Sequence, residues 1–258
     1  VRFAYVPTTL LAQVDASIGG KTGVNIAGYK NMLGTIRQPE FTYICPQVLE
    51  SLPMEDFQAG AAEMLKTFII EDNGNYEKAI TLLKALTEDF IRLCDGATLS
   101  DGEARWPEAL ADRLQDLTPL IAAAAGVKAG VVSRDQFEDG ERRKLNLGHT
   151  LGHGIEAQSN FTISHGKAVA IGMALVAKAG VSKAICSQDA YMQIVAALSK
   201  FELPQSTNIS AQTLLDSALS DKKRAGGTVN LIVPTAIGSC AIVPTAVDTL
   251  KSFIEEGL

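Results

Sequence analysis

Apolar residues recur at helical spacing through most of the chain that follows Pro53. In each such segment they stand three and four positions apart, which gathers them on one face of an α-helix. The pattern predicts helices over residues 55–70, 76–94, 107–128, 148–157, 165–186, 190–198, 211–219 and 246–256. The expected fold class is therefore α+β and mostly α-helical, with a helical domain over residues 53–258.

Two parts of the chain depart from helical spacing. Residues 228–244 read TVNLIVPTAIGSCAIVP, two β-prone runs around a glycine, which predicts a small β-hairpin. Residues 1–52 predict strands at 2–6 and 41–45 with a helix at 8–17, so they form a separate α/β segment. Because the chain opens directly on a predicted strand, we expect it to be a piece of a longer protein.

Composition limits the functions open to this chain. A hydrophobic fraction of 47% supports a packed core, and a net charge of -6 argues against a nucleic-acid partner. No apolar run in the sequence approaches the roughly 20 residues of a membrane span. The four cysteines form no CxxC pair, which indicates free thiols in a reducing compartment. We expect a cytoplasmic protein with no membrane partner.

Histidine is scarce in this sequence, and its three copies are clustered. His149, His153 and His165 lie within 17 positions, and the first two stand four apart, on one face of a predicted helix. Two imidazoles and a carboxylate suit a catalytic divalent metal. Spacing alone pairs His149 with His153, and it leaves Glu63 and Glu156 as candidate carboxylates. Glu63 is favoured because its flanks are apolar, although a surface ion pair with Lys66 remains an alternative.

A glycine-rich loop and several cations form a second group. Gly19, Gly20 and Gly23 would let the backbone approach a ligand, with Lys21 and Lys30 supplying charge. The loop is neither a Walker A motif nor a GxGxxG fingerprint, so alone it is a weak signal. Basic residues near the histidines in an acidic protein favour a small anionic substrate.

Six strings, in order along the whole chain, carry a resemblance to the 3-dehydroquinate synthase family. They are VPTTLLAQVDASIGGKTGVN, YKNMLG, AGAAEMLK, RRKLNLGHTLGHGIE, HGKAVAIGM and DKKR. The resemblance implies that residues 1–52 are the remnant of an N-terminal, Rossmann-like NAD-binding domain. It implies that residues 53–258 bind Zn²⁺ (or Co²⁺) and substrate. The glycine-rich loop that binds the NAD pyrophosphate in this family would precede the PTTLL string, and it is missing here. We therefore expect this chain alone to bind NAD poorly and to turn over little or not at all.

The resemblance also assigns roles to individual residues. It makes Glu63, His149 and His165 the metal ligands and turns His153 toward substrate. Further catalytic residues would be Lys21, Lys66, Arg142 and Asn146, and substrate would also contact Asp15, Asn31, Lys128 and Lys222. The residues implied to contact NAD are Thr8, Thr9, Asp15, Lys21, Lys30, Val48, Leu49, Glu50 and Ser51.

The implied reaction converts 3-deoxy-D-arabino-heptulosonate 7-phosphate to 3-dehydroquinate and phosphate, with NAD recycled, in the shikimate pathway of aromatic amino acid biosynthesis. Members of the family are often dimeric, so a homodimer is expected. The alternatives are another sugar-phosphate cyclase, a metal- and NAD-dependent polyol dehydrogenase, or a non-enzymatic role for this piece of chain.

Overall fold

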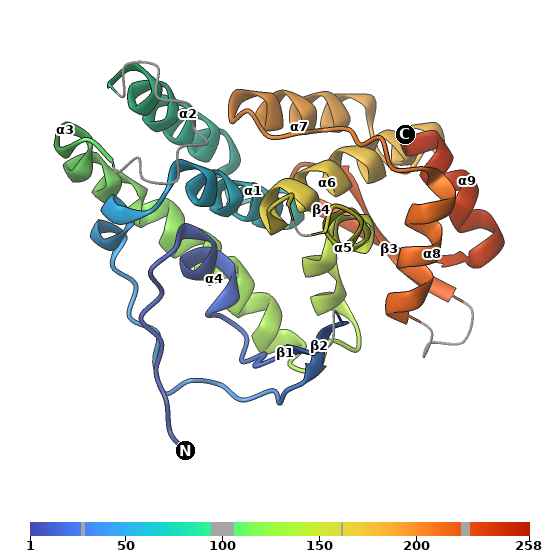
Figure 1. The fold of residues 1–258 in the computed structure, drawn as a ribbon, viewed down its shortest axis with the longest axis horizontal. Coiled ribbons are helices and arrows are strands. Elements are labelled where there is room, and N and C mark those ends of the chain that lie inside the picture. The colour runs from blue at the N-terminus through green and yellow to red at the C-terminus, as the bar shows by residue number, and fades with distance from the viewer. Residues whose placement is uncertain (27–28, 94–105, 161, 223–227) are drawn as a thin grey trace.

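The computed structural model describes residues 1–26, 29–93, 106–160, 162–222 and 228–258. The side chains of residues 25–32 and 220–222 are also outside the description. Within these ranges the chain is mostly helical, as predicted, with two small two-stranded antiparallel sheets (Figure 1).

The helices carry the core, and their bounds follow the apolar periodicity closely. The α-helices are α1 (Met54–Ile70), α2 (Tyr76–Leu93), α3 (Glu108–Ala111), α4 (Thr118–Arg134), α5 (His149–Gln158), α6 (His165–Ser182), α7 (Gln188–Lys200), α8 (Ala211–Lys222) and α9 (Val247–Gly257). Other helical segments are the π-helix η1 (Ala12–Ala16) and the 3-10 helices η2 (Pro46–Ser51), η3 (Asp112–Leu117) and η4 (Glu141–Asn146).

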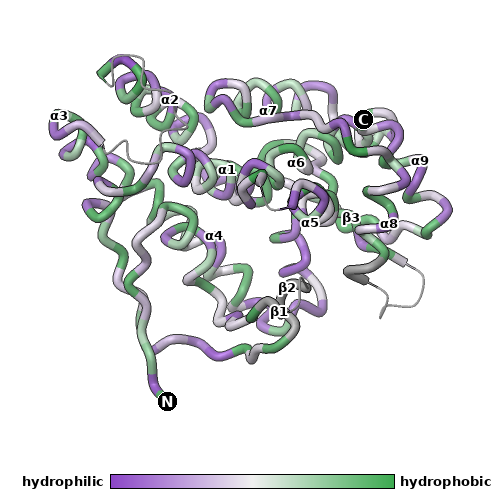
Figure 2. The backbone as a smooth tube through the Cα atoms, in the orientation of Figure 1, coloured by the Kyte–Doolittle hydropathy of each residue, from purple (hydrophilic) through white to green (hydrophobic). Residues whose placement is uncertain are grey.

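The central helix of this arrangement is α6, which contacts α1, α5, α7 and α9. Its sequence is apolar almost all round, which is typical of a helix with neighbours on every side (Figure 2). The predicted hairpin is confirmed as β3 (Thr228–Ala236) and β4 (Ser239–Ala246), and β3 packs on α6. The core therefore surrounds α6.

One predicted helix is wrong in its extent. Residues 107–128 were expected to form a single helix, but they divide into α3, η3 and the first part of α4. Pro119 lies in the first turn of α4, where its missing N–H does no harm, whereas inside a longer helix it would remove a hydrogen bond.

The helical stretch Glu108–Arg134 is long and apolar enough to cross a membrane by length and composition alone. This stretch corrects the expectation, based on uninterrupted apolar runs, that the sequence holds no candidate span. Its Leu117, Ile121 and Ala124 are buried in the protein core, and a core helix of this kind passes the same test. The finding is weak support for a membrane span.

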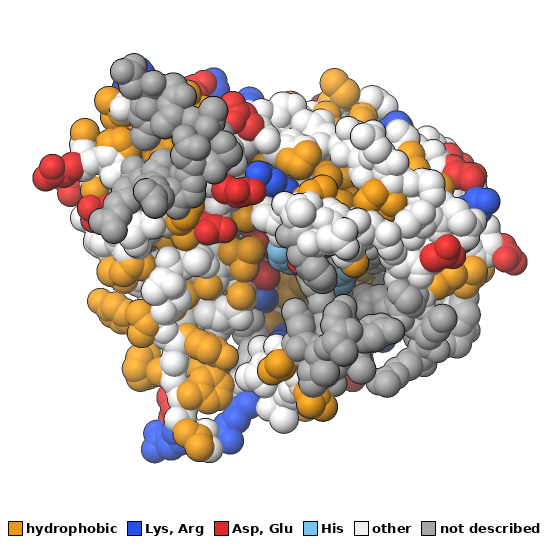
Figure 3. Space-filling model, viewed as in Figure 1, with side chains coloured by type: hydrophobic (Ala, Val, Ile, Leu, Met, Phe, Trp, Pro, Cys, Tyr) orange, Lys and Arg blue, Asp and Glu red, His pale blue; other side chains and the backbone are white. Residues whose placement is uncertain are grey.

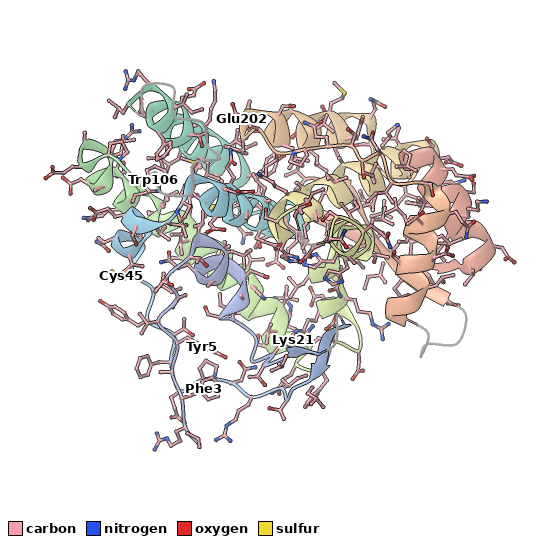
Figure 4. All side chains as sticks on the ribbon, in the orientation of Figure 1. Phe3, Tyr5, Lys21, Cys45, Trp106 and Glu202 are labelled. Atoms are coloured by element: carbon pink, nitrogen blue, oxygen red, sulfur yellow. The ribbon has the colours of Figure 1, made fainter. Side chains whose placement is uncertain are left out.

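The N-terminal segment departs from the prediction in two places. Residues 2–6 and 41–45 lie parallel to each other, joined by the Tyr5–Thr42 bridge, without forming full strands. The stretch expected to be a loop contains a short hairpin of β1 (Val24–Ile26) and β2 (Tyr29–Leu33). Figure 4 shows Phe3 and Tyr5 on the parallel segment and Lys21 close to the hairpin. The domain boundary near residue 52 stays a prediction.

Candidate metal centre

Helix α1 brings a carboxylate into the protein interior. Its side chains are buried along nearly the whole helix, and Glu63 is fully buried near its centre. Lys66, one turn later, is also buried, and its Nζ lies 2.5 Å from Glu63 Oε2. Burying a carboxylate costs free energy unless a cation compensates it. The surface ion pair considered from the sequence is therefore excluded.

Glycines bring the two histidine helices against α1 and against each other. A Cβ at Gly172 of α6 would lie 2.0 Å from the Gly148 carbonyl oxygen, just before α5. A Cβ at Gly166 would lie 2.4 Å from the backbone of Ala59 in α1. Because only glycine permits these approaches, His149 at the start of α5 and His165 at the start of α6 meet near Glu63. Figure 3 shows histidine at the bottom of a hollow, among acidic and basic side chains.

The three candidate ligand groups converge on one point. Glu63 Oε1 lies 3.8 Å from His149 Nε2 and 3.6 Å from His165 Nε2. The ligand atoms of these three residues all lie within 4.8 Å of one another. The geometry therefore selects Glu63 over Glu156, the other carboxylate that the sequence left open.

The hydrogen bonds of the two histidines set their tautomers. His149 Nδ1 lies 3.0 Å from the Leu147 carbonyl oxygen, and His165 Nδ1 lies 3.0 Å from Glu156 Oε2. Both partners only accept, so both Nδ1 atoms carry protons and both Nε2 atoms present lone pairs. Burial is the main cause that lowers the pKa of His149 well below its usual value, with help from the charge of Lys66.

The fit to a cation follows from these donors. Glu63 Oε1 is buried and has no hydrogen-bond partner among the described residues. Two imidazole lone pairs face the same oxygen, and three such donors repel one another unless a positive charge lies between them. Two nitrogens and one carboxylate form a donor set typical of a catalytic Zn²⁺ site.

His153 lies beside this group without joining it. Its ring centroid is 5.3 Å from that of His149 and 5.9 Å from that of His165. Helical spacing pairs His149 with His153, whereas the candidate ligand group in the structure contains His165 in that place. The role of His153 toward substrate stays a prediction.

A buried cluster of opposite charges extends from the histidines toward η1. Asp15 Oδ1 lies 2.6 Å from Lys128 Nζ and 3.7 Å from Lys66 Nζ. Burial disfavours the ionised Asp15, but the two ammonium groups outweigh it and hold its pKa well below the usual range. Burial likewise opposes the charge on Lys66, but the carboxylates of Asp15 and Glu63 outweigh burial and raise the pKa of Lys66. For Lys128 burial wins, and its pKa is lowered.

The structure adds Glu138, which sequence reasoning missed. Its carboxylate contacts the ammonium of Lys21 and the side-chain amide of Asn146. Nearby, Arg142 is buried and donates from Nη2 to the Gly19 carbonyl oxygen at 2.8 Å. The sequence signal for Glu138 was its position just before a basic and histidine-rich string. Acidic residues in such positions are common on protein surfaces.

Other predicted site residues lie away from this centre or outside the described side chains. Thr8 is exposed, and Thr9 Oγ1 accepts the Ala12 N–H. Within the described ranges, no hydrogen bond or ion pair links the following to the metal-ligand group: Thr8, Thr9, Val48, Leu49, Glu50 and Ser51. The side chains of Lys30, Asn31 and Lys222 are outside the description.

Comparisons with known proteins agree with the motif resemblance. Residues 1–59 match the family described as 3-dehydroquinate synthase N-terminal, and residues 60–224 match 3-dehydroquinate synthase C-terminal. A 3-dehydroquinate synthase of Synechocystis is 40% identical over 253 residues, covering 96% of this chain and 64% of the relative. One from Sulfurisphaera tokodaii is 35% identical, covering 98% of this chain and 67% of the relative.

Solved structures show the same fold. A 2-epi-5-epi-valiolone synthase from Streptomyces hygroscopicus, with NAD⁺ and Zn²⁺ bound, has a TM-score of 0.78 at 21% identity, covering 99% of this chain and 66% of its own. A 2-deoxy-scyllo-inosose synthase has a TM-score of 0.74 at 25% identity, covering 100% of this chain and 66% of its own. The chain belongs to the 3-dehydroquinate synthase family, and it spans about 64% of the length of the first relatives it matches.

Proposed function

We propose that this chain forms the metal- and substrate-binding part of a 3-dehydroquinate synthase. The reaction converts 3-deoxy-D-arabino-heptulosonate 7-phosphate to 3-dehydroquinate and phosphate. The observation that carries the proposal is the convergence of Glu63 Oε1 with two imidazole lone pairs, next to the buried charges of Lys66 and Asp15. The identity of 40% to a curated synthase supports this member of the sugar-phosphate cyclases over its relatives.

Glu63, His149 and His165 would hold a divalent ion such as Zn²⁺ or Co²⁺. When bound, the ion supplies Lewis-acid polarisation of a substrate hydroxyl. Support for these two metals comes from related cyclases, one solved with Zn²⁺ and a 2-deoxy-scyllo-inosose synthase solved with Co²⁺. Leu147 and Glu156 orient the two imidazoles through their Nδ1 atoms.

The cations around this centre would bind the two anionic groups of the substrate. Lys66 and Lys128 are held in place by Asp15, so their positions are fixed before substrate arrives. Arg142 donates to Gly19 of the glycine-rich loop, and Glu138 contacts both Lys21 of that loop and Asn146. Asn31 and Lys222 are proposed further contacts. His153, beside the metal ligands, would exchange a proton with substrate.

NAD is required by the family reaction, and the predicted contacts lie on the N-terminal segment and η2. Thr9 Oγ1 accepts the Ala12 N–H and can still donate its own proton, and Leu49 is fully buried. The side chain of Lys30 is outside the description, so the contacts to the dinucleotide stay a prediction.

The test is calorimetric binding of substrate to the purified chain loaded with Zn²⁺. We expect the carboxylated heptulosonate phosphate to bind only with metal present, and more tightly than a heptulose phosphate that lacks the carboxylate. His165→Ala serves as the control that removes the metal. Absence of metal-dependent binding would contradict the proposal, and preference for the uncarboxylated sugar would favour another cyclase.

A second assay separates synthase from dehydrogenase. With NAD and substrate, a synthase releases phosphate without net NADH, whereas a polyol dehydrogenase accumulates NADH absorbance. A cytoplasmic location and a homodimer stay predictions.

A further inference from the structure

The loop of residues 135–140 joins α4 to η4 and is wound around one carboxylate. Asp135 Oδ2 accepts the backbone N–H groups of Gly140 at 2.8 Å and Arg142 at 2.9 Å. Its Oδ1 accepts the Asp139 N–H at 3.0 Å. Within the loop Glu138 has a φ of 66°, a left-handed conformation that few non-glycine residues adopt. The carboxylate thus holds the loop in an unusual shape.

This shape directs two side chains at the glycine-rich loop, which is more than a hundred residues away in the sequence. Glu138 contacts the ammonium of Lys21, and Arg142 Nη2 donates to the Gly19 carbonyl oxygen at 2.8 Å. The approach is close, because a Cβ at Gly19 would lie 2.7 Å from Arg142 Nη2. Gly19, with a φ of 101°, is therefore held against the guanidinium.

The same loop faces the metal side of the site. Glu138 also contacts the Asn146 amide, which lies three residues before His149. Arg142, in η4, donates from Nη1 to the Gln136 carbonyl oxygen at 2.5 Å, so its guanidinium is also fixed by the loop. A single loop therefore bridges the glycine-rich segment and the segment that leads into α5.

We propose that Asp135 is a positioning residue that, by holding this loop, fastens residues 19–21 to the metal-binding part of the site. What the positioned Lys21 and Arg142 act on rests on the function proposed above. The fastening itself does not depend on turnover, so it can be measured separately.

Loss of Asp135 should leave the rest of the fold in place. The end of α4 is held independently by Arg134, whose guanidinium bonds Glu141 at 2.8 Å and Glu71 at 2.9 Å. None of these ion pairs involves the Asp135 carboxylate. An Asp135 variant therefore tests the loop rather than the stability of the helices.

The experiment is hydrogen–deuterium exchange of the purified chain, with Asp135→Ala, Asp135→Asn and Asp139→Ala. Asp139 is an exposed residue of the same loop and charge, which makes it a matched control. In Asp135→Ala we expect amides of residues 138–142 to exchange roughly tenfold faster or more, and amides of residues 19–22 to accelerate as well. Asp135→Asn keeps one acceptor oxygen, so its exchange rates should lie between those of the parent and Asp135→Ala. Asp139→Ala should exchange at the same rates as the parent.

Zn²⁺ affinity is measured in parallel and should change by less than about twofold in all three variants, since the ligands are on other elements. Faster exchange confined to residues 138–142 would overturn the proposal, because the role would then be local. Unchanged exchange in Asp135→Ala, or loss of Zn²⁺ affinity in it, would overturn it too. Failure of metal-dependent substrate binding would contradict the proposed function. The exchange results would still test the role of Asp135, because they do not depend on substrate.

Discussion

Glu156 Oε2 lies 3.0 Å from His165 Nδ1, on the side of the imidazole opposite to Glu63. The contact places the proton on Nδ1 and leaves the Nε2 lone pair facing Glu63 Oε1, 3.6 Å away. Carboxylates in this position fix the ring and raise the basicity of a ligating histidine. Replacing Glu156 with Gln should lower Zn²⁺ affinity by roughly tenfold, and replacing it with Ala by up to about a hundredfold.

Competition with a chromophoric chelator measures these affinities. An unchanged affinity in Glu156→Ala would mean that His165 is oriented by other contacts.

The three histidines should differ in their effect on metal binding. His149→Ala and His165→Ala each remove a ligand, so we expect Co²⁺ affinity to fall by more than about a hundredfold. His153→Ala should retain the Co²⁺ absorption spectrum, because its ring lies outside the ligand group. If His153→Ala instead abolished binding while His165→Ala did not, the metal would lie on the α5 pair.

Lys66 should stabilise the metal-free protein strongly. Its removal leaves the buried Glu63 and the nearby Asp15 without a shared cation. Breaking such a buried pair costs about 3–5 kcal/mol, so Lys66→Met should unfold at much lower urea. Lys84→Met breaks the exposed Lys84–Glu88 pair on α2 and should cost at most about 0.5 kcal/mol.

Added Zn²⁺ should restore part of the loss in Lys66→Met by supplying a positive charge beside Glu63. Equal urea midpoints for Lys66→Met and Lys84→Met would contradict this account of the buried pair.

The free energy of unfolding should depend on pH in acid because of Asp15. Although burial opposes its ionisation, Lys66 and Lys128 hold its folded pKa below the unfolded value of about 3.9. Its contribution is therefore fully present above about pH 4 and is lost as pH falls through the folded pKa. In urea unfolding between pH 3 and 7, the stability difference between the parent and Asp15→Asn should be constant near neutrality and shrink in acid. A difference that grew in acid would have the wrong sign.

Glycine at the crossing of α5 and α6 should be essential to the site. Gly172→Ala places a methyl group 2.0 Å from the Gly148 carbonyl oxygen, so the start of α5 must shift. We expect a loss of about 1–3 kcal/mol and weaker Zn²⁺ binding, because His149 moves with α5. Gly126→Ala in α4 meets no atom within 4 Å and should stabilise the protein by about 0.5–1 kcal/mol. Thermal unfolding of the two variants measures the change in stability, and titration with Zn²⁺ measures the change in metal affinity.

The sequence by itself determined the helices, the β3–β4 hairpin and the candidate ligand types. Helical periodicity in α1 and α6 reports which faces are buried, and this is a local property that residues three and four apart carry. The six motif strings were enough to indicate the family, which the comparisons confirmed over residues 1–224.

Only the tertiary structure decided which of the candidate ligand residues lie together. Local spacing pairs His149 with His153, because it reports only on residues within one helix. The Gly172–Gly148 and Gly166–Ala59 approaches bring α6 against α5 and α1, which places His165 beside Glu63 instead. Glu138 likewise could not be identified from the sequence, because its contacts with Lys21 and Asn146 form only in the folded chain. Contacts between distant segments depend on how closely backbones approach, and no periodicity within one helix records that distance.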